Sequence, residues 1–167
     1  MSIYSQTLRV IKIFHGTTVD GPGLRTSIYF AGCEHRCPYC HNPESWDMNA
    51  GEDMSIANII DEIVENKFNV TFSGGDPLYQ NIENLTLLAK EIHRLNKTIW
   101  LYTGFTIEEI KDDEKYKDLL REIDVIVDGP FMIDKKNIDI LFRGSSNQRI
   151  LKNDKEGSWE LYEEYNQ

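Results

Sequence analysis

The sequence predicts an α/β fold in which a mostly parallel sheet forms an incomplete βα barrel with one open side. The first observation is that short β-branched and aromatic runs alternate with segments of helical periodicity, which is typical of βαβ units with right-handed crossovers. The second observation is the length of the chain. A complete eight-unit barrel takes about 250 residues, and this chain has 167, so only part of a barrel can be built.

Strand signals recur along the chain as short runs that are bounded by Gly, Pro, Asn or Asp. The clearest run, residues 124–128, is apolar enough for a fully buried strand, and Gly129-Pro130 ends it. Asp20-Gly21-Pro22-Gly23 marks a turn between the first two strands. Strands are predicted at residues 8–14, 26–30, 70–73, 98–102 and 124–128, with weaker candidates at 138–142 and 148–152.

Helix signals lie between these strands. Apolar residues with helical spacing follow Ser55, which is well placed to act as an N-cap. Thr106 and Glu109 have the spacing of a capping box at the start of a later helical segment. The acidic, aromatic tail at 159–165 is expected to be either a docked helix or a frayed end. Helices are predicted at residues 56–64, 82–95 and 106–123.

Composition indicates a soluble globular protein, with 40% hydrophobic and 28% charged residues. We expect one domain over residues 1–167, with a motif core at about 20–148 and an acidic tail at 153–167. The formal net charge of −10 would repel nucleic acid. The sequence has neither a signal-peptide core nor an apolar run long enough to span a membrane. Clustered cysteines in odd number cannot form a disulfide framework, so we expect a reducing, cytoplasmic location.

All three cysteines of the chain lie within one short loop as Cys33, Cys37 and Cys40. Soft thiolates at such close spacing select zinc, copper(I) or an iron–sulfur cluster. A cubane cluster is normally held by four thiolates, one on each iron. Three thiolates would leave one iron open to another ligand. The spacing therefore predicts a [4Fe–4S] cluster with a vacant coordination position.

The alternative is a structural zinc site with His35 or His41 as the fourth ligand, in which case the chain would be a zinc-stabilised binding module. Zinc sites usually pair their ligands as two knuckles that lie a dozen or more residues apart. Here every candidate ligand lies in one loop, and His41 follows Cys40 directly, so chelation of the same ion would be strained. We therefore favour the cluster.

Four unusual loops follow directly on predicted strands. In a parallel sheet, the loops at the carboxyl ends of the strands carry function. We therefore expect the cysteine loop and the other three to converge on one rim. The glycines among them let the backbone approach a ligand closely. The other three loops are Gly74-Gly75-Asp76-Pro77, Thr103-Gly104 and Asp128-Gly129-Pro130.

The C-x3-C-x-aromatic-C pattern of the cysteine loop resembles the signature of radical S-adenosylmethionine enzymes. This resemblance implies a partial barrel of that type, a [4Fe–4S] cluster on Cys33, Cys37 and Cys40, and S-adenosylmethionine chelating the vacant iron. It also implies that Tyr39 packs near the adenine and that the Gly74-Gly75 loop holds the methionyl amine, although the family often has Glu where this chain has Asp76. The cofactor-binding positions are predicted to be Tyr39, Cys40, His41, Gly74, Gly75, Asp76, Thr103 and Asp128.

Asp128 has two interpretations, and the contact to the cofactor carboxylate has several candidates. Asp128 follows a strand and on general grounds is a turn or N-cap aspartate; by analogy it helps to coordinate a monovalent cation or to order the methionyl end, near Thr103. Formate-lyase activases carry a lysine just after the equivalent strand, where this chain has Gly129-Pro130. The contact to the cofactor carboxylate must then come from elsewhere. The candidates are Arg143, Ser145 and Asn147.

Further motifs, in order along the chain, are similar to those of the activating proteins of anaerobic ribonucleoside-triphosphate reductases. The turn that begins at Asp20 and ends at Arg25 resembles the opening motif of glycyl-radical-enzyme activases, which implies polar contacts from these two residues. The remaining motifs are Gly32-Cys33-x-His35-x-Cys37-x-x-Cys40-x-Asn42-x-x-Ser45-Trp46, Ser73-Gly74-Gly75-Asp76-Pro77-Leu78, Tyr102-Thr103-Gly104, Val127-Asp128-Gly129-Pro130-Phe131 and Arg143-Gly144-Ser145-Ser146-Asn147-Gln148.

The resemblance implies an activase of the radical type. Reductive cleavage of S-adenosylmethionine would yield a 5′-deoxyadenosyl radical, which abstracts hydrogen from a C-terminal glycine of the large reductase subunit. Flavodoxin or ferredoxin would supply the electron, and no side chain is needed as a general acid or base. Another small enzyme of the superfamily, such as a 7-carboxy-7-deazaguanine synthase, would share the cysteine loop, but the ordered motifs argue against it.

Overall fold

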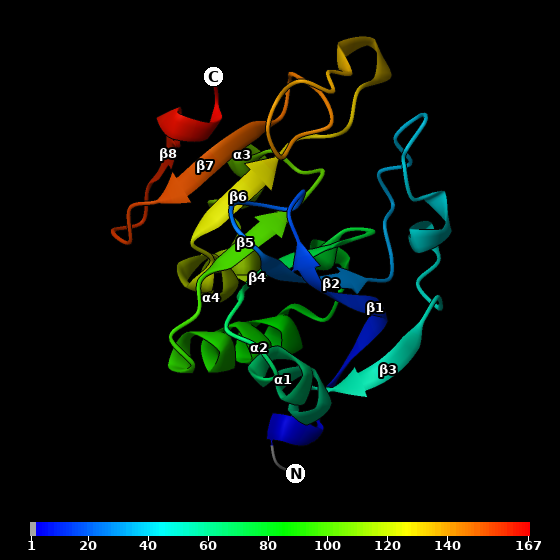
Figure 1. The fold of residues 1–167 in the computed structure, drawn as a ribbon, viewed down its shortest axis with the longest axis vertical. Coiled ribbons are helices and arrows are strands. Elements are labelled where there is room, and N and C mark those ends of the chain that lie inside the picture. Colours follow the sequence, from blue (N-terminus) through cyan, green and yellow to red (C-terminus); the bar gives the residue numbers. More distant parts are fainter. Residues whose placement is uncertain (1–2) are drawn as a thin grey trace.

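The computed structural model describes residues 3–167. A single sheet of eight strands runs through the molecule in the order β3-β1-β2-β4-β5-β6-β7-β8 (Figure 1). The strands are β1 (Thr7–Thr17), β2 (Arg25–Phe30), β3 (Glu52–Ser55), β4 (Asn69–Gly74), β5 (Ile99–Tyr102), β6 (Val125–Asp128), β7 (Arg149–Asn153) and β8 (Trp159–Leu161). The helices are α1 (Ile56–Val64), α2 (Ile82–Arg94), α3 (Ile107–Ile110) and α4 (Lys117–Glu122).

The centre of the sheet is parallel and its flanks are antiparallel. Strands β2, β4, β5 and β6 pair in parallel, whereas β3–β1, β1–β2, β6–β7 and β7–β8 are antiparallel. The prediction of a mostly parallel sheet is therefore wrong for the flanks. Parallel neighbours need a crossover of a dozen or more residues, usually a helix. The loops at 18–24 and 154–158 are too short for one, so they form hairpins.

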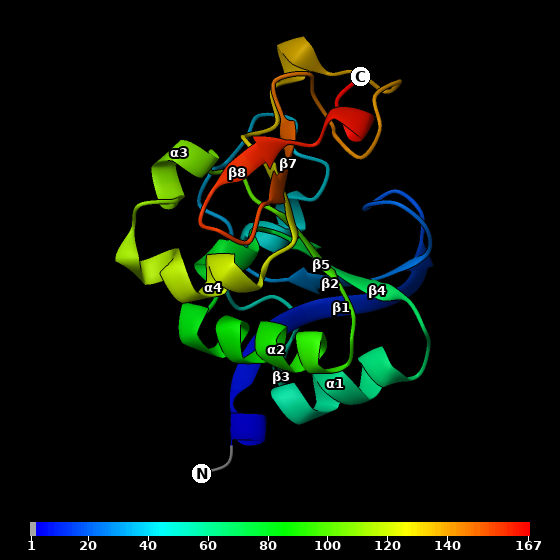
Figure 2. The same cartoon turned by 90° about the vertical axis from the view of Figure 1, so that its left-hand side faces the viewer.

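Period-two alternation in the central strands gives the sheet two apolar faces. Leu101 and Ile126 pack against the layer formed by α1, α2 and α4 (Figure 2). Trp100, Val125 and Val127 point to the opposite face, where they form a second cluster. Within the described residues, no helix combines the length and apolar character that a bilayer crossing requires. The sheet is thus covered by helices on one side and by its own C-terminal segments on the other.

The predicted helices 56–64 and 82–95 are confirmed as α1 and α2. The Ser55 hydroxyl accepts a hydrogen bond from the Asn58 amide at 3.1 Å, as an N-cap does. The predicted helix 106–123 is wrong as one element, because it is divided into α3, a 3-10 turn and α4. Asp113 is the N-cap of the 3-10 turn, since its carboxylate accepts a hydrogen bond from the Lys115 amide at 3.0 Å.

The remaining predictions concern the two weaker strand candidates and the C-terminal tail. The strand candidate at 148–152 is confirmed as β7, whereas residues 138–142 form turns and no strand. Strand β3 was not predicted, because its sequence, Glu-Asp-Met-Ser, lacks β-branched and aromatic residues. The tail is docked, but as β8 followed by a 3-10 turn rather than as a helix. Its Tyr162 and Tyr165 pack on the second apolar cluster.

Candidate functional site

The four predicted loops meet at a cavity of about 330 Å³ at the carboxyl ends of the central strands. The parallel register places these ends together, since Phe30 of β2 pairs with Gly74 of β4 and Tyr102 of β5 pairs with Val127 of β6. The prediction that these loops converge on one rim is confirmed. The cavity is lined by Asp20, Tyr29, Cys33, His35, Cys37, Cys40, His41, Asn42, Trp46, Ser73, Gly74, Gly75, Tyr102, Thr103, Gly104, Gly129, Phe131, Gly144 and Gln148.

The cysteine loop lies along one wall of this cavity without regular secondary structure. Its three thiols are free and half-buried. Two of its residues, Arg36 and Tyr39, have positive φ values of 52° and 61°, a region that costs non-glycine residues energy. Partial burial raises the pKa of the Cys33 thiol to about 11 and raises the pKa of Cys37 as well. Both thiols therefore hold their protons at neutral pH until a bound metal displaces them.

The spacing of the three thiols does not match a site for one ion. Thiolates bound tetrahedrally to a single zinc ion, each about 2.3 Å from it, lie about 4 Å apart. In residues 3–167, the ligand atoms of His15, Glu62 and Glu65 all lie within 4.8 Å of one another, and the three thiols form no such group. A set of separated thiols around one cavity suits a cluster in which each iron takes one cysteine.

Asp76 is the centre of a hydrogen-bond network that joins three of the four loops. Its Oδ2 atom accepts from His35 Nε2 at 2.7 Å, from Thr103 Oγ1 at 2.8 Å and from the Gly104 amide at 2.9 Å. Its Oδ1 atom accepts from the Leu78 amide at 2.9 Å. The residue is 1% exposed and does not line the cavity. A carboxylate has about four acceptor positions, so these bonds satisfy it.

Glycines allow His35 and the neighbouring backbone to pack this closely. A Cβ on Gly104 would lie 2.6 Å from the His35 ring, whose centroid is already 4.6 Å from that of Phe105 and 5.4 Å from that of Tyr79. A Cβ on Gly75 would lie 2.5 Å from the Gly32 carbonyl oxygen. The glycines predicted to let the backbone approach a ligand therefore also bring the rim loops against one another.

Of the three cysteine-loop residues predicted to bind the cofactor, Cys40 and His41 line the cavity and Tyr39 does not. Tyr39 is 77% exposed and does not line the cavity. His41 does line it, and its ring lies 5.0 Å from the ring of Phe131. Cys40, which lies between Tyr39 and His41 in the sequence, also lines the cavity. In this structure His41 and Phe131, from two different loops, are the aromatic pair at the cavity wall.

Asp128, the last residue of β6, makes long-range contacts and not the local turn or N-cap contacts of the general interpretation, since Thr106 is the N-cap of α3. It is 1% exposed, and its carboxylate accepts from the Ile107 amide at the start of α3 and from the Arg149 guanidinium, both at Oδ2, at 2.8 and 2.5 Å. Arg149 also bonds Glu108 at 2.6 Å. Asp128 does not line the cavity, whereas Thr103 does. Asp128 thus fixes the position of α3 relative to β6 and β7.

The turn at 20–25 places its two predicted contact residues differently. Asp20 lines the cavity, where it accepts a hydrogen bond from the Tyr29 hydroxyl at 2.6 Å. Arg25, the first residue of β2, is 2% exposed. It lies on the sheet face that carries Trp100, where it donates to Thr71 Oγ1 at 2.8 Å and packs on the Trp100 ring. Burial lowers the pKa of Arg25 to about 10. Because the side chain is buried, its guanidinium is not available to a partner.

Sequence reasoning missed Tyr29, which lines the cavity from β2. A signal was present, because Ile28 and Phe30 are buried on the helix side and alternation turns Tyr29 to the other face. Burial, together with the hydrogen bond to Asp20, raises the pKa of this tyrosine well above its ordinary value. Tyr29 thus stays a neutral donor that orients the Asp20 carboxylate.

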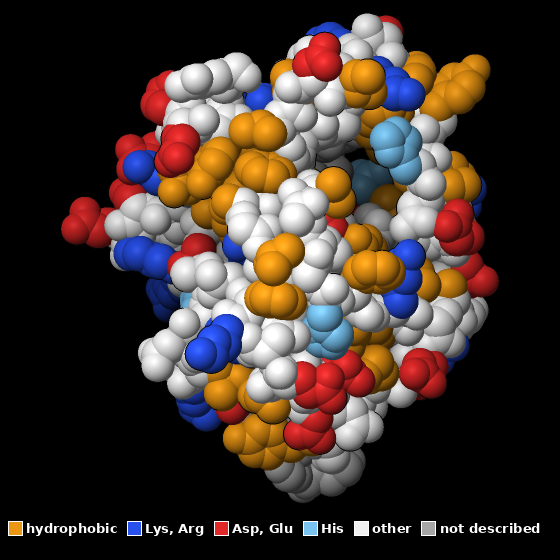
Figure 3. Space-filling view, viewed as in Figure 1, with side chains coloured by type: hydrophobic (Ala, Val, Ile, Leu, Met, Phe, Trp, Pro, Cys, Tyr) orange, Lys and Arg blue, Asp and Glu red, His pale blue; other side chains and the backbone are white. Residues whose placement is uncertain are grey.

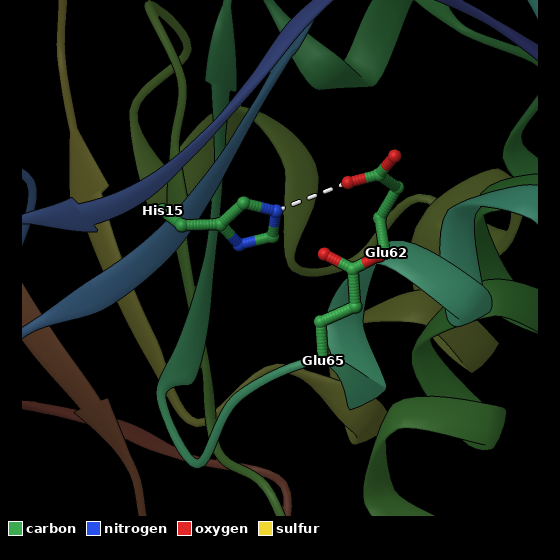
Figure 4. A group of neighbouring side chains, drawn as sticks. All are labelled: His15, Glu62 and Glu65. Atoms are coloured by element: carbon green, nitrogen blue, oxygen red, sulfur yellow. Dashed lines mark hydrogen bonds and ion pairs between the residues drawn. The ribbon is translucent and has the colours of Figure 1, made fainter.

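A second group of potential ligands lies away from the cavity, between β1 and the end of α1 (Figure 4). The Phe68 amide bonds Asn66 Oδ1 at 3.0 Å, which makes the Asn66 amide nitrogen the donor to His15 Nδ1 at 2.8 Å. The neutral imidazole then carries its proton on Nε2 and donates it to Glu62 at 3.1 Å. These hydrogen bonds join β1 to the end of α1, so we assign this group a structural role.

Comparison with known proteins agrees with this site. The sequence model of a family described as "4Fe-4S single cluster domain" matches residues 19–151. The anaerobic ribonucleoside-triphosphate reductase-activating protein of Salmonella typhi is 36% identical over an alignment of 142 positions, which covers 79% of this chain and 90% of that protein. The protein of the same name from Enterobacteria phage T4 is 35% identical over an alignment of 158 positions, which covers 89% of this chain and 96% of that protein.

A solved structure, QueE from Escherichia coli, superposes with a TM-score of 0.51 at 16% identity, covering 60% of this chain and 53% of that one. This likeness concerns the fold alone, a mixed α/β architecture with an open sheet. The sequence relatives are close enough, and are covered over enough of their length, to assign the family. The chain belongs to the anaerobic ribonucleoside-triphosphate reductase-activating proteins.

Proposed function

We propose that this chain is a radical S-adenosylmethionine activase that installs a glycyl radical on the large subunit of an anaerobic ribonucleoside-triphosphate reductase. The observation that carries the proposal is the position of three separated thiols on one cavity at the carboxyl ends of parallel strands, in a chain of this family. When bound, a [4Fe–4S] cluster and S-adenosylmethionine supply the radical chemistry: reductive cleavage of the cofactor and removal of a hydrogen atom from a glycine.

Cys33, Cys37 and Cys40 would hold the cluster, each through its thiolate. The fit is supported by the donor set, since the three soft thiols line one cavity and are not gathered as they would be around one ion. We extend the proposal to the whole of residues 1–167 as one domain of partial-barrel type. The antiparallel flanks of the sheet are compatible with this, because they lie outside the parallel strands that end at the cavity.

For S-adenosylmethionine, the backbone of Gly74 and Gly75 is proposed to accept from the methionyl amine, since both residues line the cavity and have no side chain in the way. Thr103, which also lines the cavity, and His41 beside Phe131 are the candidate contacts for the rest of the molecule. Tyr39 stays a proposed contact to the adenine, and it would have to turn inward from its exposed position.

Asp76 and Asp128 are proposed to act on the cofactor indirectly. Both carboxylates are 1% exposed and bonded to protein groups, so neither has a free face toward the cavity. Asp76 holds the cysteine loop in place through His35, and Asp128 holds α3 and the loop after β6. They are positioning residues for the rim. Their removal would therefore affect the site through the loops they fix.

The proposed partners are the large reductase subunit and a low-potential electron donor of the flavodoxin or ferredoxin type, in a reducing cytoplasm. Neither nucleic acid nor a membrane is a proposed partner, because the formal net charge of −10 disfavours polyanions and anionic lipid surfaces alike. No side chain is proposed as a general acid or base, since removal of a hydrogen atom needs neither.

The proposal is tested by anaerobic incubation of the chain with S-adenosylmethionine, a reductant and the large reductase subunit, followed by electron paramagnetic resonance. We expect a glycyl doublet with the wild type, and no doublet and no cofactor cleavage with Cys37→Ala, because one cluster ligand is lost. Glu34→Ala is the matched control, since Glu34 is exposed in the same loop and does not line the cavity. Cleavage at the wild-type rate by Cys37→Ala would refute the cluster assignment.

Metal analysis separates the zinc-stabilised module from the activase. Protein purified without air should be brown, with absorbance near roughly 400 nm from a cysteine-ligated cluster, and should contain about four irons per chain. One zinc per colourless chain would instead support the binding module.

A further inference from the structure

Residues 131–146 form an ordered excursion, here called the arm, between the end of β6 and the start of β7. It begins at the cavity, because Phe131 and Gly144 both line it. The two legs of the arm are paired at the base by a β-bridge between Lys136 and Ser145 and by a hydrogen bond from the Ser146 amide to the Lys135 carbonyl at 2.8 Å. The arm is therefore a fixed projection beside the cavity mouth.

The polar motif that ends in Asn147-Gln148 holds this base. The Ser145 hydroxyl, fully buried, accepts from the Met132 amide at 3.2 Å. The Gln148 side chain accepts from the Gly144 amide at 2.8 Å and from the Ser145 amide at 3.1 Å, and it donates to the Gly129 carbonyl at 3.1 Å. The motif thus holds both legs of the arm at the end of β6. These hydrogen bonds give the motif a structural role that does not depend on cofactor binding.

The fixed arm displays apolar side chains to solvent. Ile138 is 85% exposed, Leu141 54%, Ile133 41% and Met132 39%. Figure 3 shows hydrophobic side chains mixed with charged ones at the top of the molecule, above a hollow. Single exposed apolar residues are common, but a group of them on one projection marks an interaction surface. Hydrogen bonds at its base hold the arm beside the cavity.

A second exposed apolar pair lies in another segment that reaches the cavity. Val19 is 70% exposed and Leu24 is 50% exposed, and both lie in the loop between β1 and β2. Asp20 of the same loop lines the cavity. Two segments from distant parts of the sequence therefore both line the cavity and expose apolar side chains.

We infer that the arm and the 18–24 loop together dock the reductase subunit so that its glycine-bearing segment enters the cavity. This inference rests on the proposed function. The occupant follows from the location: whatever covers this surface also covers the cavity mouth. A second copy of the chain bound here would block the mouth, whereas the reductase must reach through it. The glycine itself has no side chain that could bind in the cavity, so apolar contacts of the reductase with the arm and with the 18–24 loop supply the affinity.

The test is Ile138→Asp combined with Leu141→Asp, with Val64→Asp as the matched control. Val64 is 51% exposed, a fraction similar to the 54% of Leu141, and it lies on α1 away from the cavity. Three quantities are measured on the cluster-loaded chain: cofactor cleavage without the reductase, affinity for the reductase by surface-immobilised binding, and the glycyl doublet. None of the substituted side chains lines the cavity, so cleavage without the reductase should equal the wild type in every variant.

We expect the arm variant to bind the reductase at least tenfold more weakly than the wild type, and to yield correspondingly less glycyl radical at subsaturating reductase. Val64→Asp should bind within twofold of the wild type. Equal reductase affinity of the arm variant and the wild type would overturn the docking inference while leaving the activase proposal intact. So would dissociation of a wild-type homodimer by the arm substitutions without a change in reductase affinity. Cofactor cleavage by the wild type without any glycyl radical would instead count against the proposed function.

Discussion

The molecule contains two histidine–aspartate hydrogen bonds at opposite ends of the same strand, β5. At its carboxyl end, His35 bonds Asp76 at 2.7 Å, and the Asp76 carboxylate also accepts from Thr103 directly after the strand. At its amino end, His93 bonds Asp124 at 3.0 Å, and the Asp124 carboxylate also accepts from the Ile99 amide. A histidine–aspartate pair therefore stabilises the structure at each end of β5.

The two pairs differ in what they fasten. Asp76 is 1% exposed and bonds only neutral protein donors apart from His35, which belongs to the cysteine loop. Asp124 is partly exposed and shares its charge with Lys155 at 2.8 Å, while His93 also bonds Glu122 at 2.8 Å. The amino-end pair joins helices to the sheet. The carboxyl-end pair positions the loop that carries the three thiols, and this difference separates stability from function.

The largest effect is expected from Asp76→Ala, which leaves His35, Thr103 and two backbone amides without their acceptor. Each unpaired buried donor costs about 1–3 kcal/mol, and partial relaxation should leave a loss of about 3–5 kcal/mol in the free energy of unfolding. Asp76→Asn keeps one oxygen and should lose about 1–2 kcal/mol. Urea unfolding and iron content after anaerobic reconstitution are the measurements.

Asp124→Ala is the comparison variant for this prediction. It should also destabilise the chain, because the Ile99 amide and His93 lose their acceptor. Its iron content should equal that of the wild type under conditions in which both are folded, whereas that of Asp76→Ala should fall. Equal iron loading of the two variants would mean that Asp76 contributes to stability only.

A smaller effect is expected from Gly104→Ala. The new Cβ would lie 2.6 Å from the His35 ring, which already packs against Phe105 and Tyr79. Overpacking of this kind costs about 1–3 kcal/mol, and the displaced ring should weaken its bond to Asp76. Urea unfolding of Gly104→Ala, with and without His35→Ala, measures the effect. The loss should shrink in the double variant, and an additive loss would show that the clash is elsewhere.

Much of the rim could be predicted from the sequence, because it depends on local signals. Runs of β-branched residues that end at Gly, Pro or Cys located the central strands, and parallel pairing brings their carboxyl ends together. The flanks could not be predicted in the same way. Strand β3 has no β-propensity of its own and exists because β1 offers an unpaired edge.

Which side chain enters the cavity depends on contacts between loops, which local sequence does not specify. Tyr39 was expected inside on the strength of its place in the cysteine motif, whereas Tyr29 lines the cavity and Tyr39 is exposed. Asp76 was expected to face the cofactor, but its partners come from positions 35, 103 and 104 of the chain. Long-range hydrogen bonds of this kind become visible only when the loops are placed together.

The smallest effect is expected at the amino-end pair, from His93→Gln. Hydrogen bonds to Asp124 first, and to Glu122, raise the pKa of His93 above its usual value of about 6.5, because both ring nitrogens donate to carboxylates. A raised folded-state pKa stabilises the chain fully below the unfolded value, and this contribution is lost as pH rises through the folded value. The wild type should therefore exceed His93→Gln by about 1 kcal/mol at pH 6 and by clearly less at pH 9. Urea unfolding at both values measures this, with exposed Lys90→Gln on the same helix as the control. A difference that grows with pH would show that His93 acts as a neutral donor, and the charge-based distinction between the two histidine–aspartate pairs would then fail.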